Sequence, residues 1–218
     1  MNHLKIKATL ITDMLGTQPN NEKLFEEYIK SKAPEGVTEE SLNISPDEMI
    51  EKGTTVYRRN KEGVICLCDY QVKGFIKTVG DTIRQRNNSK KEKIDGKTSK
   101  SGWESWKGKA DTNIHVYPRL IPLGKTKADD VLSRPLRART MQGDRVSLAR
   151  SEVISEGTEF VFDIVIMGLI TKSQIIECLD EGAFYGIGQW RNAGYGRFKY
   201  EILEDKNVSS ISLANISW

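Results

Sequence analysis

GIGQWRNAGYGRF, residues 186–198, joins a helical pattern to a strand pattern in this 218-residue chain. Its glycines form two Gly-x-Gly pairs, Gly186 with Gly188 and Gly194 with Gly196. Because glycine lacks a Cβ, such a loop lets another backbone or a ligand come close. We therefore predict a connection whose backbone N–H groups are open to an anion, above all phosphate. The alternative is a structural turn whose glycines serve only the close packing of a helix on a sheet.

Between and beside these glycines stand side chains that suit a nucleic acid. Arg191 and Arg197 carry positive charge, and Asn192 adds a polar amide. Trp190 and Tyr195 offer flat rings on which a base can stack. The order of helix, glycines and strand is the reverse of the dinucleotide-binding fingerprint, in which the glycines follow a strand and open a helix. The loop is therefore predicted to contact RNA or a nucleotide ligand.

The pattern of helix, Gly-h-Gly, five residues, Gly-h-Gly and strand, where h is apolar or aromatic, resembles the C-terminal glycine-rich loop of the RAMP superfamily. These are CRISPR-associated RNA-binding proteins, which include backbone subunits of guide-RNA effector complexes and the endoribonucleases that process guide RNA. The resemblance implies a ferredoxin-like, RRM-like α+β fold with an antiparallel sheet and helices on one face. For a backbone subunit it also implies protein partners in a CRISPR-like complex and a homo-oligomer.

The chain is also similar to small uncharacterised bacteriophage and prophage proteins. They share its GQWRN-x-G-x-GRF ending and an RPLRA-x-T-x-QG-x-R run, here residues 134–145. This second resemblance implies no known chemistry. It makes a counter-defence role attractive, in which a viral protein imitates a CRISPR subunit, occupies guide RNA or sequesters a nucleotide signal.

The composition limits which classes of protein the chain can belong to. With 38% apolar and 29% charged residues the chain is typical of a globular protein, and its net charge of +3 does not by itself indicate a nucleic-acid partner. Cys66, Cys68 and Cys178 form neither an even disulfide set nor a zinc pattern, so we predict buried thiols in a reducing cytoplasm. No signal peptide or membrane-spanning run is evident. We expect one RAMP-like domain over residues 1–218 and a cytoplasmic location.

Alternating and helical apolar patterns support the α+β assignment independently of the resemblance. Strand, helix and strand near the C-terminus, with strand and helix near the N-terminus, predict a ferredoxin-like sheet with insertions. The predicted strands are residues 3–12, 54–58, 63–68, 113–124, 159–170 and 197–203, with prolines interrupting the fourth. The predicted helices begin at Asn20 or Asn21, at residues 45–48, at Asp69 and at Thr171 or Ser173.

Two insertions carry the remaining candidate RNA contacts. Residues 87–111 are almost devoid of aliphatic side chains and predict a long loop, in which Lys90 and Lys91 follow phosphates while Trp103 and Trp106 stack on bases. The alternative is a solvated charge run whose tryptophans fold back onto the body of the protein.

Residues 132–152 predict a basic hairpin around a turn at 142–144. Its arginines match the geometry of phosphate. A salt-bridged hairpin or a protein contact is the alternative. The candidate phosphate-binding residues here are Arg134, Arg137, Arg139 and Arg145.

The sequence favours binding over catalysis. His3 and His115 are the only histidines, neither lies in a recognised catalytic motif, and the acidic residues form no metal-binding pattern. We therefore assign no catalytic residue, metal or cofactor, and favour a RAMP-like RNA-binding protein. An endoribonuclease that processes guide RNA, using His3 or His115 with a tyrosine, is one alternative. A protein-binding inhibitor module, or a protein that sequesters a nucleotide signal, is the other.

Overall fold

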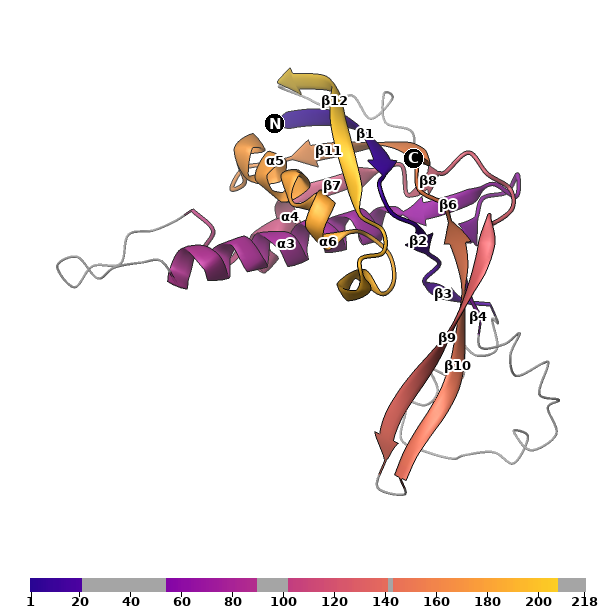
Figure 1. The fold of residues 1–218 in the computed structure, drawn as a ribbon. Helices are drawn as coiled ribbons and strands as arrows, with labels where there is room; N and C mark the ends of the chain where they lie inside the picture. The colour runs from indigo at the N-terminus through magenta and orange to yellow at the C-terminus, as the bar shows by residue number, and fades with distance from the viewer. Residues whose placement is uncertain (21–53, 90–101, 141–142, 208–218) are drawn as a thin grey trace, which may run out of the picture.

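A four-stranded antiparallel sheet forms the centre of the computed structural model, which describes residues 1–20, 54–89, 102–140 and 143–207 (Figure 1). Its strand order is β12-β1-β11-β7, and α3 and α5 are the crossover helices. The elements are β1 (Asn2–Leu10), α3 (Asp69–Ser89), β7 (Ile114–Tyr117), β11 (Glu159–Ile166), α5 (Lys172–Asp180) and β12 (Phe198–Asn207). This βαββαβ order with the first strand beside the fourth is the ferredoxin-like topology, so the predicted fold class is confirmed.

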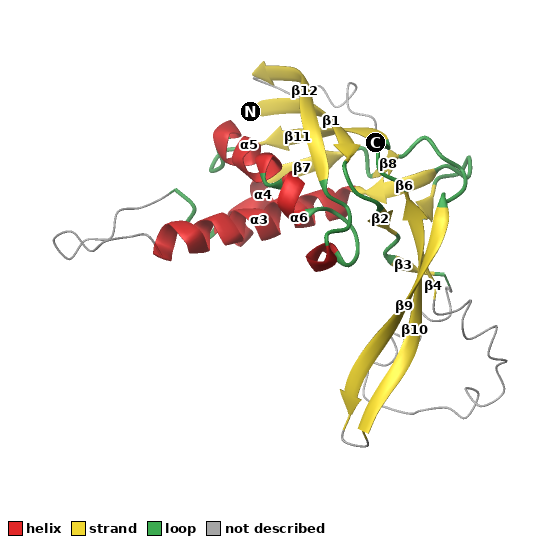
Figure 2. Ribbon diagram, in the orientation of Figure 1, coloured by secondary structure: helices red, strands yellow, loops and turns green. Residues whose placement is uncertain are grey.

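The core lies between one face of this sheet and the helices. Leu4, Ile6 and Ala8 alternate along β1 and are fully buried, as the period-2 pattern predicts. On the facing side of α3, Phe75 packs edge-on against Phe198 of β12, with ring centroids 5.1 Å apart. The helices lie together beside the sheet, whereas the projecting hairpin contains strands only (Figure 2).

Local capping explains where α5 begins. The Thr171 side chain accepts a hydrogen bond from the Gln174 backbone N–H, and the Gln174 side chain accepts one from the Thr171 N–H at 3.0 Å. This reciprocal pair is a capping box, which satisfies two backbone donors that a helix leaves unpaired. Of the two predicted caps, Thr171 is therefore the correct one. After α5 follow the short α6 (Gly182–Tyr185) and a 3-10 turn, η2 (Arg191–Ala193).

The basic hairpin consists of β9 (Asp130–Thr140) and β10 (Gly143–Ile154) and projects from the body of the protein (Figure 1). Its strands pair antiparallel from Thr140 with Gly143 to Asp130 with Val153, so residues 141–142 connect them. The root of β10 joins a second sheet of order β2-β10-β4-β3. Its other members are β2 (Met14–Leu15), β3 (Gln18–Pro19) and β4 (Thr54–Val56). The hairpin is thereby anchored to the domain at its root.

A third, small sheet has the order β5-β6-β8. It comprises β5 (Arg58–Arg59), β6 (Ile65–Cys68) and β8 (Leu120–Pro122). Residues 60–64 connect β5 and β6 as a hairpin, within the region where strands were predicted over 54–58 and 63–68. The predicted strand over 113–124 is divided into β7 and β8 by Pro118, which follows a cis peptide bond. The sequence also predicts one helix that begins at Asn20 or Asn21 and another that begins at residues 45–48. Apart from Asn20, both predictions fall on residues outside the described part of the chain.

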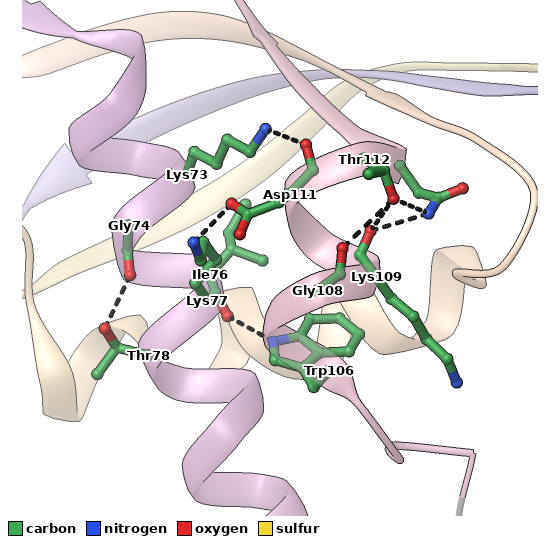
Figure 3. A network of polar contacts seen from close by, with 11 residues as sticks. Lys73, Gly74, Ile76, Lys77, Thr78, Trp106, Gly108, Lys109, Asp111 and Thr112 are labelled. Carbon is green, nitrogen blue, oxygen red and sulfur yellow. Dashed lines mark hydrogen bonds and ion pairs between the residues drawn. The ribbon is translucent and has the colours of Figure 1, made fainter.

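The predicted long loop over residues 87–111 is wrong where the structure describes it. The helix α3 continues to Ser89, and α4 (Trp106–Asn113) occupies the other end of the stretch. Trp106 is 1% exposed and its indole N–H donates to the Ile76 carbonyl of α3 at 3.3 Å, while Lys77 pairs with Asp111 across the two helices (Figure 3). The indole ring packs against α3 at Gly80. A Cβ at this position would lie 2.0 Å from the indole nitrogen, so only glycine leaves room for the ring.

Both tryptophans of this stretch belong to the core. Trp103 is 4% exposed and packs on Trp106 with ring centroids 4.6 Å apart. Neither ring is available to stack on a base, so the prediction that they contact RNA is wrong. The physical reason is that two large rings in a polar stretch supply enough apolar surface to dock a short helix. Lys90 and Lys91 lie outside the described residues.

Candidate nucleic-acid interface

The glycine-rich loop, residues 186–196, closes on itself. The Ile187 N–H donates to the Gly196 carbonyl at 2.8 Å, and the Gly196 N–H donates to the Asp13 carbonyl at 2.7 Å. Gly196 has a φ of +72°, and a Cβ there would lie 1.8 Å from the Ile187 oxygen. The two Gly-x-Gly pairs therefore meet so tightly that this position excludes every other residue.

This closure changes which backbone donors are available. The N–H of Gly186 donates to Gly182, and the N–H of Gly194 donates to Arg191. Together with Gly196, three of the four glycines use their N–H groups within the chain, so the prediction that these donors are open to an anion is wrong. Among the described residues, no group accepts a hydrogen bond from the N–H groups of residues 188–192. The donors left to a ligand therefore lie between the two glycine pairs.

Trp190 stands at this open turn in an unusual conformation. Its φ of 56° lies in the left-handed region, which costs a residue with a side chain about 1–2 kcal/mol. Its ring stacks on Tyr195 at 5.3 Å with an interplanar angle of 12°, and the Arg134 guanidinium lies 4.3 Å from its centroid. The strained backbone of Trp190 thus persists together with two contacts of its ring, with Tyr195 and with Arg134. These contacts fix the position of the ring.

The contact with Arg134 shows that the loop meets the root of the basic hairpin. A second contact supports this: the Gln189 amide oxygen accepts hydrogen bonds from the hydroxyls of Ser151 on β10, at 3.0 Å, and Thr55 on β4, at 3.1 Å. Ser151 is 2% exposed. Two candidate regions that lie far apart in the sequence thus form one structure, the junction of the hairpin root with the glycine-rich loop.

Sequence reasoning did not identify Gln189, Ser151 or Thr55. Their hydrogen bonds connect residues 38 and 134 positions apart, and no local pattern marks them. Only the pairing of β10 with β4, which sets Ser151 beside Thr55, brings the two hydroxyls to the loop. This contact could not have been predicted without knowing that parallel pairing.

The junction is basic, and parts of its arginines are buried without hydrogen-bond partners. Arg134 is 8% exposed, and its Nε and Nη1 atoms have no acceptor among the described residues. The same holds for the buried Nε atoms of Arg150 and Arg197. Such groups cost free energy in the absence of an acceptor, and Trp190 offsets that cost for Arg134 only in part, since a ring face is a weak acceptor.

Acidic groups line a cleft at the C-terminal end of the loop. An open cleft of about 650 Å³ is lined by Thr12, Asp13, Ser155, Glu156, Ala193, Gly194 and Tyr195. The Asp13 carboxylate accepts the Glu156 N–H at 3.0 Å. Because two carboxylates line this cleft, it is unsuited to phosphate, and the basic junction is the better candidate for an anionic ligand.

The remaining predicted residues are only partly placed. Arg137, Arg139 and Arg145 lie on the paired backbone of the hairpin, opposite Val146, Asp144 and Ala138. Their side chains are outside the described part of the structure. Arg191 and Asn192 lie in η2, next to Trp190, on the same turn as the available N–H groups. Of the predicted hairpin arginines, Arg134 is the one whose side chain is described, and it lies against the glycine-rich loop at Trp190.

The outer face of the central sheet carries the two histidines. His3 of β1 and His115 of β7 are both paired with Val165 of β11, so they occupy one row across the sheet. The His3 Nε2 lies 2.9 Å from Asp163 Oδ1. Lys7 on the same face pairs with Glu159 at 2.8 Å, an interaction that raises the Lys7 pKa. Within the described residues, no group of three His, Cys, Asp or Glu side chains is placed to hold a metal ion.

These features define a class: an α+β protein with the ferredoxin-like strand order and a basic hairpin docked on a C-terminal glycine-rich loop. In the described residues no helix is both long and apolar enough to cross a membrane. No protein-family model matches the chain, and no curated protein matches it.

Among solved structures, the chain is similar to one described as "Cryo-EM structure of the Type III-B Cmr-beta bound to cognate target RNA", with 8% sequence identity and a TM-score of 0.46. The match covers 94% of this chain and 60% of that one, so the present chain spans about 60% of the length of the protein it resembles. The fold class itself follows from the strand order.

Proposed function

We propose that this protein binds RNA, and that the junction of the hairpin root with the glycine-rich loop holds its phosphates. The observation that carries the proposal is the set of buried guanidinium nitrogens without acceptors, foremost those of Arg134. A guanidinium group presents a planar fork of donors that matches phosphate oxygens. The buried nitrogens have almost no accessible surface, so in this proposal a phosphate reaches them when the Trp190 ring, which covers the Arg134 guanidinium, moves aside.

The surroundings of Arg134 favour an anion for a second reason. The chain has no Asp or Glu between Glu181 and Glu201, and only Asp144 between Asp130 and Glu152. The Glu152 carboxylate at the hairpin root is engaged by the Tyr57 N–H and by Arg59. The loop between the two glycine pairs contains no acidic residue, and the N–H groups of residues 188–192 lie in it. Binding by charge and backbone donors makes no demand on base sequence.

The projecting hairpin extends the same charge away from the body. Arg137, Arg139 and Arg145 continue along it from the junction, and in this proposal they follow the strand of RNA. The finer proposal is that the protein is RAMP-like: a backbone-type subunit of a CRISPR effector, or a phage-encoded counter-defence protein on that scaffold. Its support is the ferredoxin-like topology with a glycine-rich loop between the second crossover helix and the last strand.

The test is to purify the protein at low salt and to extract and identify any nucleic acid that accompanies it. The informative variant is Arg191→Ala with Arg197→Ala, which removes two charges of the loop. A matched control is Lys61→Ala with Lys199→Ala, two exposed lysines that lie outside the junction and remove the same charge. RNA that is lost from the arginine variant and kept by the lysine variant supports the junction as the site.

Salt dependence gives the second readout. For single-stranded RNA the logarithm of the affinity falls with the logarithm of salt concentration by about 0.7 for each phosphate neutralised. The arginine variant should therefore show a smaller slope than the wild type, and the lysine variant an unchanged one. A wild-type protein that binds no RNA even at low salt would refute the proposal.

A second candidate function, RNA cleavage, is favoured by the row of histidines. Neighbouring strands lie about 4.8 Å apart, so the Cα atoms of His3 and His115 on either side of Val165 are about 10 Å apart. One imidazole could take the proton of a ribose 2′-hydroxyl, whose oxygen then attacks phosphorus. The other imidazole would protonate the departing 5′-oxygen, leaving a 2′,3′-cyclic phosphate.

This candidate has its own test. Labelled single-stranded RNA is incubated with wild type, His3→Gln and His115→Gln in the presence of a chelator, beside RNA whose riboses are 2′-deoxy. Loss of acid–base catalysis lowers a rate by about a hundredfold or more, so both variants should be nearly inactive and the 2′-deoxy strand should stay intact. RNA left uncut by the wild type, or cut equally by all three proteins, excludes cleavage by this row.

A further inference from the structure

We infer that the cleft at the C-terminal end of the glycine-rich loop takes one base of the RNA, and that it prefers guanine. The inference rests on the proposed RNA binding and names a base that the protein recognises. Contacts with phosphate make no demand on base sequence, so such a preference has to come from a separate site. The volume of the cleft, about 650 Å³, lies within the range of roughly 300–1,000 Å³ that is typical of sites for small ligands.

The walls of this cleft come from three segments that hydrogen bonds hold together. The Asp13 carbonyl accepts the Gly196 N–H at 2.7 Å, and the Thr12 hydroxyl donates to the Gly194 carbonyl at 2.9 Å. The third segment, the turn between β10 and β11, is joined by Glu156, whose N–H donates to Asp13 Oδ1 at 3.0 Å. The Asp13 carboxylate is therefore held in place before a ligand arrives, which lowers the cost of binding.

A carboxylate in this cleft suits the Watson–Crick edge of guanine better than that of another base. Asp13 is half-buried, and in the described part of the chain only its Oδ1 accepts a hydrogen bond. An ionised carboxylate accepts at both oxygens. Guanine presents two adjacent donors, the N1–H and the N2 amino group, whereas adenine, cytosine and uracil each place an acceptor beside their donor. Glu156, which is exposed in the same cleft, adds a second negative charge that favours an edge of donors.

Tyr195 supplies an aromatic ring on which the base can stack. It lines the cleft, it is half-buried, and one face of its ring lies on Trp190 with the ring centroids 5.3 Å apart. In the inferred complex the base stacks on the opposite face, as bases of single-stranded RNA do on aromatic side chains. Because Trp190 also contacts Arg134, the cleft adjoins the hairpin root, and one strand of RNA can reach both.

The test compares short oligouridine RNAs that differ at one central position, which is guanosine, inosine, adenosine, cytidine or uridine. Fluorescence anisotropy gives their affinities for wild type, Asp13→Asn and Glu62→Gln. The asparagine keeps an oxygen for the Glu156 N–H and replaces the other oxygen by an N–H donor. Glu62 is exposed in the turn between β5 and β6, away from the lining of the cleft, and its substitution controls for the lost charge. Thermal unfolding followed by circular dichroism checks that all three proteins fold.

Wild type and Glu62→Gln should bind the guanosine strand about tenfold more tightly than the adenosine strand, as a bidentate contact with a base discriminates. The inosine strand, which lacks the N2 amino group, should lie between them. Asp13→Asn should bind the adenosine strand at least as tightly as the guanosine strand, since an amide pairs with the adjacent donor and acceptor of adenine. If Asp13 served only the structure, its substitution would weaken the binding of every strand alike.

Equal affinity of the wild type for all five strands, or a guanosine preference that survives in Asp13→Asn, overturns the inference while leaving RNA binding intact. No binding of any strand refutes the proposed function itself. The same proteins are also titrated with a short arginine-containing peptide. Peptide binding that is lost in Asp13→Asn, together with equal affinity for the five RNAs, would instead assign the cleft to an arginine of a protein partner.

Discussion

Replacing Gly80 by alanine should destabilise the protein, although alanine is the better helix former. A Cβ at this position would lie 2.0 Å from Nε1 and 2.1 Å from Cε2 of Trp106. Carbon atoms in contact are normally about 3.5–4.0 Å apart, so the indole would have to move by about 1.5 Å. Trp106 is 1% exposed, so its ring lies within the packed core of the protein.

The magnitude follows from three effects. Overpacking a filled core costs about 1–3 kcal/mol. Displacement of the ring also breaks the hydrogen bond to the Ile76 carbonyl, which contributes about 1 kcal/mol. Alanine in place of glycine within a helix returns about 1 kcal/mol. We therefore expect Gly80→Ala to lower the free energy of unfolding by about 1–3 kcal/mol.

The same helix contains a matched control. A Cβ on Gly74 would meet nothing within 4 Å, so Gly74→Ala should raise the free energy of unfolding by about 0.5–1 kcal/mol. Urea unfolding followed by circular dichroism gives both values, and tryptophan fluorescence reports on the ring. If Gly80→Ala is as stable as Gly74→Ala, Trp106 does not occupy the gap in α3 and the docking of α4 is wrong.

Three other predictions follow from the same geometry. Gly196→Ala should prevent stable folding, because its Cβ would lie 1.8 Å from a backbone oxygen, whereas Gly157→Ala, at a φ of +79° in open space, should cost only about 1–2 kcal/mol in urea unfolding. Thr171→Ala removes the capping box of α5 and should cost about 1 kcal/mol, while Thr171→Ser should not. Burial raises the pKa of the Cys178 thiol, so this cysteine should resist alkylation in the native protein and react in urea; rapid native alkylation would show that Cys178 is not buried.

The central sheet was predictable because its signals are local. Alternation over β1, the apolar spacing of α3 and the threonine cap of α5 each depend on residues a few positions apart. The hairpin of β9 and β10 was predicted for the same reason. The ferredoxin-like arrangement then follows, since βαββαβ connections restrict the strand orders that are possible.

The tryptophan stretch could not be predicted because its partner is remote. Composition alone makes residues 102–113 look solvated, with lysines and glycines outnumbering apolar side chains. What decides its structure is the absence of a Cβ at Gly80, which lies 26 positions before Trp106 in the sequence. A glycine within a helix pattern by itself indicates only a locally less stable helix. Nothing in the neighbouring sequence shows that the ring of a distant tryptophan packs in the space beside it.

The glycine-rich loop combines the two interpretations that its sequence left open. Gly186 and Gly196 serve close packing, since their positions are filled by the facing backbone and their N–H groups are used within the chain. The residues between the pairs form the part that we propose faces a ligand, with Trp190 held in a strained conformation against Arg134. The packing glycines fix the position of the turn between them. That turn places the Trp190 ring against the Arg134 guanidinium. In the proposed function, recognition would therefore depend on arginines that the hairpin root supplies, and the glycines would act on it through the shape of the loop.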